Sequence, residues 1–386
     1  MRSPANSLPW LLALAALIAV AANSARAQYV RAPATEYAEQ LGRYTEARRA
    51  FEAVAEPYWN AIAEKRRLRN AKRRNGEPIG PDDYVLTQPP VYAGPPRPVD
   101  PNAPRDTPVE PDKPPMPVVA DFLRHAAEQF GFVPDRPQDE MAAKKAYVAA
   151  ANAAGLTKEQ VVHVYAFETG GHGTYDVQAG LTSGRPDARA ISPALGYNQL
   201  LSTNSVGLIA AHGEPYLAVL QRKATQLAGA PHAAMLKKIA AFRRMIALAR
   251  SVPNAWSAHD ELAKNTPGGM GIHAALLDRD LGPLLQAQKL LDSVEFARRR
   301  GRRVPLTGAE LELMNFTGDG NGYDMVSMPP ELRRQVPTAN FFQRQGYERN
   351  PIARRTGVVA ALIASIQARM ERAAQARGAK DLAAAF

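Results

Sequence analysis

Apolar and polar residues recur with a helical period over most of residues 118–376. Apolar side chains three or four positions apart share one face of a helix, and that face packs against a core. The segments with this pattern are 118–130, 138–154, 157–168, 214–228, 230–251, 274–299, 307–316 and 353–376. The alternation typical of strands is scarce. The pattern predicts a mostly helical globular domain over residues 118–376.

Two of these helices carry start signals. Thr157 and Gln160 form a capping box that opens the helix ending at Glu168, and Thr307 and Glu310 form a second one. Residues 169–196 lack helical periodicity and are rich in Gly, Ser, Thr, Asp and Pro. They predict a loop or a small irregular hairpin inserted after Glu168.

The N-terminal region divides into a helix and a spacer. Residues 28–77 predict a basic amphipathic helical segment, and residues 78–117 contain a proline every few positions. Frequent prolines exclude a helix or a central strand, so this part is expected to be an extended, semi-rigid spacer. Residues 377–386 are expected to be a C-terminal tail.

The last turns of the N-terminal helix are strongly basic. One interpretation is a solvated helix end, which the helix dipole favours. The other is electrostatic contact with an anionic envelope surface. The basic residues concerned are Lys65, Arg66, Arg67, Arg69, Lys72, Arg73 and Arg74.

The first 27 residues resemble a secretory signal peptide. Arg2 supplies a positive start, residues 8–22 are almost wholly apolar, and an Ala-x-Ala site ends at Ala27. An uncleaved anchor is the alternative, although the apolar run is short for a membrane span. The chain has no cysteine, which excludes a lipobox anchor and a disulfide framework. We expect a soluble, exported, periplasmic protein.

The net charge changes the choice of partners. The chain has 48 basic and 37 acidic residues, a formal charge of +11, and removal of residues 1–27 takes away two arginines and leaves +9. After export the available polyanions are the cell wall, lipid head groups and acidic surface sugars. No basic motif is interleaved with aromatic residues, so nucleic acid is not expected as a partner. The composition does not determine the oligomeric state.

The stretch "YAFETGGHGTYD" contains the strongest candidate for chemistry. Glu168 shares a helix face with Val161, Val164 and Tyr165, where desolvation raises the pKa of a carboxyl group. A carboxylic acid still protonated near neutral pH can donate a proton to a leaving oxygen. The glycines that follow would let backbone pass close by and open one wall of a cleft. The alternative is an exposed glutamate at a frayed helix end.

Three motifs in order resemble the lysozyme-like fold of lytic transglycosylases and goose-type lysozymes. They are "FETGG", then "SPALGYNQLL", and later "LELMNFTGDGNGYD". In those families a catalytic glutamate closes a helix, a Gly-x-x-Gln segment follows, and an Asn-containing stretch lines the cleft. The resemblance covers residues 157–320. The loop after Glu168 is longer than usual, and Asn315 is displaced by one position from the family's Asn.

The resemblance implies cleavage of the β-1,4 bond between N-acetylmuramic acid and N-acetylglucosamine in peptidoglycan glycan strands. Glu168 would protonate the glycosidic oxygen and then take the proton of the muramoyl 6-hydroxyl, which closes a 1,6-anhydro ring. No cofactor is needed. The residues that would bind sugar or peptide groups are Thr169, Tyr197, Gln199, Asn315, Phe316 and Tyr323.

Other chemistries compete with this one. Hydrolysis would use a second carboxylate to activate water, and Asp176 and Asp187 are candidates, although loop aspartates are common turn residues. Asp324 follows "GDGNG" and could reach the cleft, but the EF-hand spacing for calcium fails there. His163 and His172 lack the H-E-x-x-H spacing of zinc hydrolases, so no metal is expected. A non-catalytic periplasmic protein that binds glycan or a partner is the alternative of another class.

We expect the mature protein to begin at Gln28, because cleavage follows the Ala-x-Ala site. N-terminal mass spectrometry of the exported protein checks this. Recovery of an intact segment 1–27 in the membrane fraction would contradict it.

Overall fold

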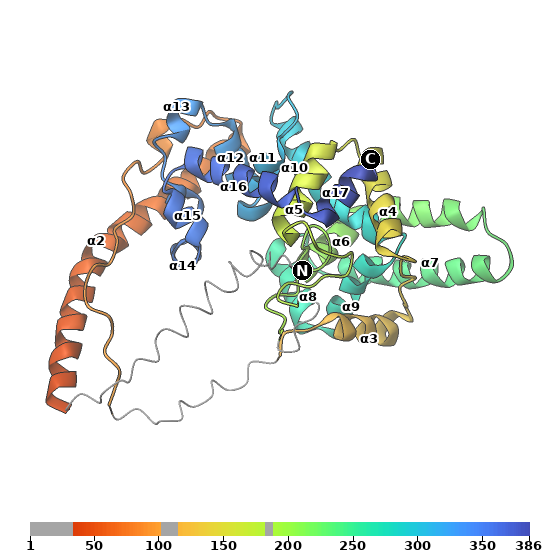
Figure 1. The fold of residues 1–386 in the computed structure, drawn as a ribbon, viewed down its shortest axis with the longest axis horizontal. Coiled ribbons are helices and arrows are strands. Elements are labelled where there is room, and N and C mark those ends of the chain that lie inside the picture. Colours follow the sequence, from red (N-terminus) through yellow and green to blue (C-terminus); the bar gives the residue numbers. More distant parts are fainter. Residues whose placement is uncertain (1–33, 102–114, 182–187) are drawn as a thin grey trace, which may run out of the picture. The chain divides into compact units, whose positions relative to one another are not determined.

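The computed structural model describes residues 34–101, 115–181 and 188–386, and their regular structure is helical (Figure 1). The predicted signal peptide lies outside these residues. The described part contains no strand, only isolated β-bridges that join Gln178 to Leu195, Leu195 to Leu200 and Pro337 to Val358. In the same part, no helix combines the length and apolar character needed to cross a membrane. The mostly α fold class is therefore confirmed.

The elements follow one another along the chain with short connections, apart from the segments at 84–118 and 170–201. Their bounds are α2 (Ala34–Asn75), η1 (Pro81–Asp83), α3 (Val119–Phe130), α4 (Glu140–Ala153), α5 (Lys158–Thr169), α6 (Ser202–Ala224), α7 (Gly229–Ala249), α8 (Trp256–Asn265), α9 (Pro267–His273), η2 (Ala274–Leu277), α10 (Gly282–Arg299), α11 (Gly308–Thr317), α12 (Asp319–Ser327), α13 (Pro330–Arg333), η3 (Thr338–Phe341), α14 (Arg344–Glu348), α15 (Pro351–Thr356), α16 (Val359–Ala373) and α17 (Arg377–Ala384).

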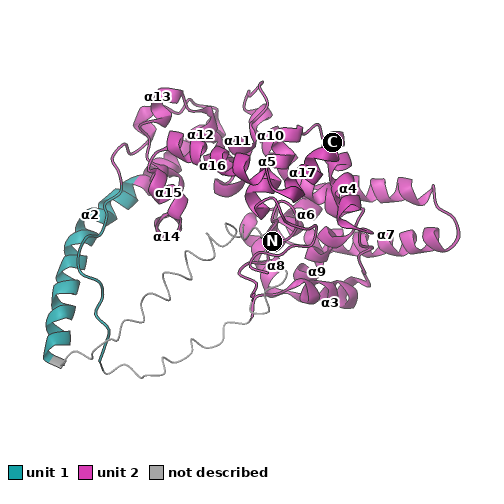
Figure 2. Ribbon diagram, in the orientation of Figure 1, with its two compact units in different colours: residues 1–61, 89–113 teal, residues 62–88, 114–386 magenta. Residues whose placement is uncertain are grey.

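The chain forms two compact units (Figure 2). The first comprises residues 1–61 and 89–113, and the second comprises residues 62–88 and 114–386. In the first unit, Tyr92 packs edge-on against Phe51 and Tyr44 of α2, and the Arg48 guanidinium lies 4.9 Å from the centre of the Tyr92 ring. These contacts hold the extended segment against the helix.

The second unit contains two hydrophobic cores. One is built from α4, α5, α11, α16 and α17, and the other from α3, α6, α7 and α9. Helix α10 contributes Leu285 to the second core and Leu290 and Val294 to the first. Each large apolar side chain buried in this way stabilises the fold by about 1.5–3 kcal/mol. Helix α5, which carries Glu168, belongs to the first core.

Both predicted capping boxes are present. The Gln160 backbone N–H donates to Thr157 Oγ1 (3.2 Å), and the Thr157 N–H donates to Gln160 Oε1 (2.9 Å). Thr307 and Glu310 make the same reciprocal pair at the start of α11. These local signals set the register of the two helices that supply the candidate site.

Helix α6 begins at Ser202, twelve residues before the predicted start at 214. Pro215 favours a helix start in the sequence, but it lies inside α6. Helices α8 and α9 were not predicted. Helix α9 contains three glycines, which suggest a loop, yet a Cβ at Gly271 would lie 2.9 Å from the Ala126 nitrogen of α3. Glycine is needed there because two backbones touch.

The last ten residues are part of the domain, so the predicted C-terminal tail is wrong. Residues Arg377–Ala384 form α17, and the side chains of Ala379 and Leu382 are fully buried. The Ala379 N–H also donates to the Gly171 carbonyl (3.0 Å). Helix α17 thereby fixes the loop that follows α5.

The proline-rich spacer begins later than predicted. Residues 78–88 belong to the second unit, where η1 forms and Tyr84 is buried with its ring 5.9 Å from that of Phe341. From Pro89 the described residues have no regular structure until α3. Among the described residues, the segment without regular structure therefore starts at Pro89, and residues 102–114 of the predicted spacer lie outside the description.

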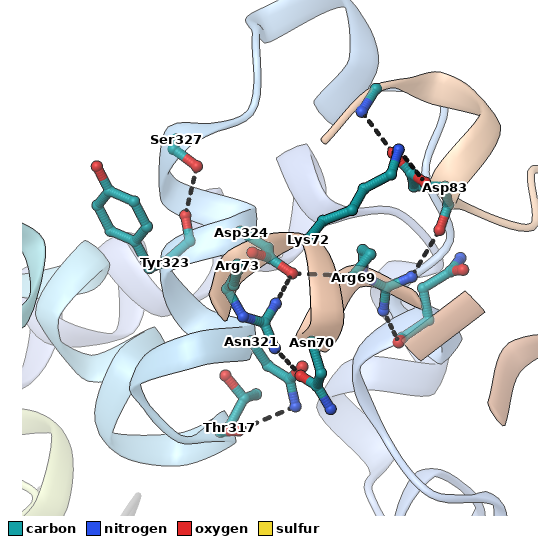
Figure 3. Close-up of polar contacts among 12 residues, drawn as sticks. Arg69, Asn70, Lys72, Arg73, Asp83, Thr317, Asn321, Tyr323, Asp324 and Ser327 are labelled. Atoms are coloured by element: carbon teal, nitrogen blue, oxygen red, sulfur yellow. Dashed lines mark hydrogen bonds and ion pairs between the residues drawn. The ribbon is translucent and has the colours of Figure 1, made fainter. Parts of the chain in front are cut away.

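The basic end of α2 is largely used inside the second unit, which neither interpretation of the sequence anticipated (Figure 3). Arg69 is fully buried, and its guanidinium donates to the carbonyls of Asp83 (2.8 Å) and Asn340 (2.7 Å). Its Nε lies 3.4 Å from Asp324 Oδ2, and Arg73 pairs with the same carboxylate. Asp324, which was expected to reach a cleft, is instead a buried counter-charge.

We expect Asp324→Asn to lower the free energy of unfolding by about 3–5 kcal/mol, because it leaves Arg69 charged and buried without its carboxylate. Urea unfolding followed by circular dichroism measures the loss. Glu331→Gln, which removes an exposed pair with Arg334, is the control and should leave the free energy of unfolding nearly unchanged. Equal, small losses in both variants would contradict a structural role for the buried pair.

Candidate active site

Helix α5 places Glu168 in its last turn, at the edge of the first core. Val161, Val164 and Tyr165 are fully buried on the preceding turns. The helix ends at Gly170, whose φ of 64° lies in the left-handed region that glycine adopts readily. The Glu168 side chain is partly exposed, while its carboxyl group is surrounded by protein.

A second carboxyl group, that of Glu312 on α11, faces Glu168. The Glu312 side chain is 1% exposed. The two carboxyl groups lie within hydrogen-bonding range. Since an ionised carboxylate only accepts hydrogen bonds, a bond between them requires a proton on one group. Two carboxyl groups this close disfavour double ionisation, so the arrangement favours a shared proton.

Burial is the main cause of the raised pKa values in this pair. It raises the pKa of Glu168 to about 7, against the lowering effects of the Glu312 hydrogen bond, Arg369, Lys289 and Asn315. Burial, followed by the charge of Glu168, holds the pKa of Glu312 well above its usual range. Burial therefore favours the protonated form of both groups, and their proximity disfavours ionisation of both at once. This is the behaviour of a general acid/base beside a fixed hydrogen-bond donor.

Asn315 is the predicted binding residue that the structure brings to Glu168. Its Nδ2 donates to Glu168 Oε1 at 3.1 Å. Because Glu312 and Asn315 lie three positions apart on α11, they occupy one face of that helix. The one-residue displacement of this Asn in the motif therefore does not prevent it from contacting the carboxyl group.

The "GYNQ" residues anchor the loop after α5. Tyr197 is 2% exposed, and its hydroxyl donates to Glu140 Oε1 (2.7 Å). Its ring packs 5.4 Å from that of Tyr165 and lines a small pocket with Tyr147 and Tyr175. The structure records no contact between Tyr197 and Glu168.

Gln199 and Thr169 are also engaged by backbone groups. Gln199 has a φ of 45°, and its amide donates to the carbonyls of Gly196 (2.8 Å) and Val177 (3.2 Å). The Thr169 hydroxyl donates to the Tyr165 carbonyl of its own helix (2.7 Å). Substrate contacts by these two side chains remain predictions from the resemblance.

The other two predicted aromatic residues, Phe316 and Tyr323, differ in exposure, since Phe316 is exposed and Tyr323 is partly buried. Phe316, next to Asn315, is 42% exposed, and its ring packs edge-on at 5.7 Å from Phe342. The Tyr323 hydroxyl donates to the Arg300 carbonyl (3.1 Å), and its ring packs against Phe296. Phe316 is thus the aromatic residue available to a ligand beside Asn315.

The predicted second carboxylates do not join Glu168 in the described structure. Asp176 accepts a hydrogen bond from the Thr174 hydroxyl (2.8 Å) and lies 3.7 Å from Arg136. These are the contacts of a turn residue. Asp187 lies outside the described residues.

The glycines after Glu168 serve close packing, which corrects the expectation that they open a cleft wall. A Cβ at Gly171, where φ is 76°, would lie 2.3 Å from the Ala373 carbonyl oxygen at the end of α16. A Cβ at Gly173 would lie 2.6 Å from the Thr169 side chain. The glycines therefore let the loop pass between α5 and the α16–α17 junction.

No three His, Cys, Asp or Glu side chains converge on a metal position in residues 34–101, 115–181 and 188–386. His163 lies 3.7 Å from Glu159 of its own helix, and His172 is exposed. These two histidines do not meet Glu168.

Sequence reasoning missed Glu312, Lys289 and Arg369. Glu312 stands inside the motif "LELMNFTG", three residues before Asn315, and that helical spacing was a usable signal. Lys289 on α10 and Arg369 on α16 have no local pattern that links them to Glu168.

No protein-family model matches the chain, and no curated protein or solved structure matches it either. The lysozyme-like resemblance is therefore carried by the motifs alone.

We expect the carboxyl pair to destabilise the fold as the pH rises. A carboxyl group whose pKa is raised in the folded state stabilises it fully below the unfolded pKa, and this contribution is lost as the pH rises through the folded pKa. Glu312→Gln should therefore flatten the decline in unfolding free energy above pH 5 and gain about 1–3 kcal/mol at pH 8. Urea unfolding at several pH values measures it.

Glu371→Gln, an exposed change on α16, is the control and should leave the pH dependence unchanged. A Glu312→Gln variant that is equally destabilised at pH 5 and pH 8 would show that Glu312 is an ionised, paired carboxylate.

Proposed function

We propose that the protein is an exported lytic transglycosylase that cleaves peptidoglycan, with Glu168 as its single acid/base. The observation that supports this is the Glu168 carboxyl group, whose pKa is about 7 at the end of a buried helix. The amide of Asn315 holds one of its oxygens at 3.1 Å. A group half-protonated near neutral pH can give a proton and take one back in the same reaction.

The proposed reaction begins with transfer of the Glu168 proton to the oxygen of the β-1,4 bond. The bond between C1 and that oxygen breaks, and the acetamido oxygen of the substrate stabilises C1. The 6-hydroxyl oxygen then attacks C1 while the Glu168 carboxylate takes the hydroxyl proton. The products are a chain end with a free hydroxyl and a 1,6-anhydro ring, and Glu168 is protonated again.

Glu312 favours this intramolecular route over hydrolysis. A base that activates water needs an ionised carboxylate several ångströms away, across the sugar ring. Glu312 is in hydrogen-bonding range of Glu168, and burial favours its protonated form. Its proton would stabilise the Glu168 carboxylate after the first transfer.

A non-catalytic glycan-binding protein is the second candidate. Tyr197 and Gln199, which the resemblance assigns to the substrate of a catalytic cleft, both bond to protein groups instead, so a glycan-binding protein would have to use other side chains, such as the exposed Phe316. A periplasmic location and an anionic envelope surface near Arg67 and Arg74, both exposed on α2, are compatible with either function.

We expect Glu168→Gln to lower the rate of peptidoglycan cleavage by roughly two to four orders of magnitude, because an amide cannot supply the proton. Its stability should be unchanged or higher, since an amide avoids the desolvation of a charge. Chromatography and mass spectrometry of the muropeptides measure both rate and product. Asp176→Asn is the matched control and should retain activity within about threefold, as expected for a turn residue.

The products separate the candidates. Anhydromuropeptides support the transglycosylase, and reducing ends would show a hydrolase. An unchanged muropeptide profile with wild-type protein, together with retained binding to sacculi, would identify a binding protein. Full activity of Glu168→Gln would show that Glu168 is not the acid.

A further inference from the structure

Two basic side chains act on the carboxyl pair without pairing with it. Lys289 on α10 and Arg369 on α16 both favour the ionised form of Glu168. Within the described part of the chain, neither head group forms a hydrogen bond or an ion pair within 4.0 Å. Both side chains are partly buried. They are therefore cations without a direct protein counter-ion.

Arg369 is held in place although none of the described residues accepts a hydrogen bond from it. Its guanidinium lies over the Phe167 ring, 4.6 Å from the ring centre, and Phe167 immediately precedes Glu168. Burial lowers the pKa of Arg369, which reflects the cost of desolvating its charge. A guanidinium offers five N–H donors, and leaving them unpaired in a partly buried position is unfavourable. A ligand anion would remove that cost.

The charges around Glu168 also favour an anion. The groups that act on it are Glu312 and Asn315 on α11, Lys289 on α10 and Arg369 on α16. Two close, buried carboxyl groups disfavour a double negative charge, whereas Lys289 and Arg369 contribute two positive ones. Arg372, which also acts on Arg369, adds a further positive charge one turn away.

We propose that Lys289 and Arg369 bind a carboxylate of the substrate beside the bond to be cleaved, and that this carboxylate keeps Glu168 in its acid form. The inference rests on the proposed function. Arginine matches a carboxylate with two parallel hydrogen bonds. N-acetylmuramic acid offers such a group, either as its free lactyl carboxylate or as the carboxylates of an attached peptide. Chitin oligomers have the same β-1,4 bonds and acetamido groups but no carboxylate.

Binding of the carboxylate changes the field at Glu168. In the free protein, Lys289 and Arg369 favour the ionised form of Glu168. A carboxylate seated on both cations neutralises them and adds a like charge, so the pKa of Glu168 rises. The substrate would therefore keep the acid protonated to a higher pH than the free protein does. A neutral chitin oligomer would not.

The test uses three substrates: peptide-bearing glycan strands, strands stripped of peptide so that the lactyl carboxylate is free, and chitin oligomers. Arg369→Gln and Lys289→Gln should each raise KM for a carboxylate-bearing strand roughly tenfold, as expected for loss of one charge-assisted hydrogen bond. KM for chitin oligomers should stay within about twofold, since they offer no such bond. Whichever strand shows the tenfold effect identifies the lactyl or the peptide source.

The pH profile is the second readout. The fall of kcat/KM at high pH reports the pKa of the acid in the free protein. The fall of kcat at high pH reports its pKa in the complex with substrate. The kcat limb should lie at higher pH than the kcat/KM limb for carboxylate-bearing strands in wild type, and this gap should close in Arg369→Gln. Arg372→Gln, exposed on the same helix, is the matched control and should keep the gap.

Two outcomes overturn the inference separately from the function. If wild type cleaves all substrates and both variants lose the same factor on strands and chitin oligomers, the cations serve only as counter-charges to Glu168. If wild type cleaves nothing, the proposed function is wrong. Co-sedimentation with insoluble peptidoglycan and with chitin then tests by binding alone whether Lys289 and Arg369 form a carboxylate site. Equal binding of the two polymers, unaffected by Arg369→Gln, would then contradict it.

Discussion

The buried contact between Glu168 and Glu312 is the constraint on which the candidate site depends. Two carboxyl groups cannot both ionise at this separation, so one proton stays between them. The contact requires α5 and α11 to meet at one turn of each helix, and the two capping boxes fix the starts of both. Helices α10 and α16 then supply cations at a distance instead of direct ion pairs. The result is a carboxyl group poised near neutral pH.

A second buried charge in the same region, that of Asp324, has a structural role only. Asp324 lies on α12, which follows α11 after Gly318, and it receives both Arg69 and Arg73. The Arg69 guanidinium also donates hydrogen bonds to the backbone carbonyls of residues 83 and 340. Every charge there has a partner. Lys289 and Arg369 have no such partner among the described residues, and that contrast is the physical argument for a ligand.

Close backbone approach explains much of the glycine content around the site. Gly171 lets the loop after α5 touch Ala373, and the Gly171 carbonyl accepts from Ala379. Any side chain at Gly171 would push α16 and α17 away from α5. Since α16 carries Arg369, this packing also bears on the electrostatics of Glu168. The glycines that looked like an open cleft wall therefore belong to the support of the site.

The sequence by itself determined the helical class, the two capped helices and the place of Glu168 at the end of one of them. These features follow from short-range hydrogen bonds and from the 3.6-residue period, both of which are visible in a local window. It also predicted Asn315, which stands 147 residues away from Glu168 and still donates to it.

Only the tertiary structure decided which charges meet. Glu312, Lys289 and Arg369 come from three separate helices, and Arg69 pairs with a residue far along the chain. Coulomb interactions and burial depend on distance in space, which local periodicity does not encode. Local periodicity also failed to predict that α17 and residues 78–88 belong to the domain. A few buried side chains, such as Leu382 and Tyr84, determine where its core ends.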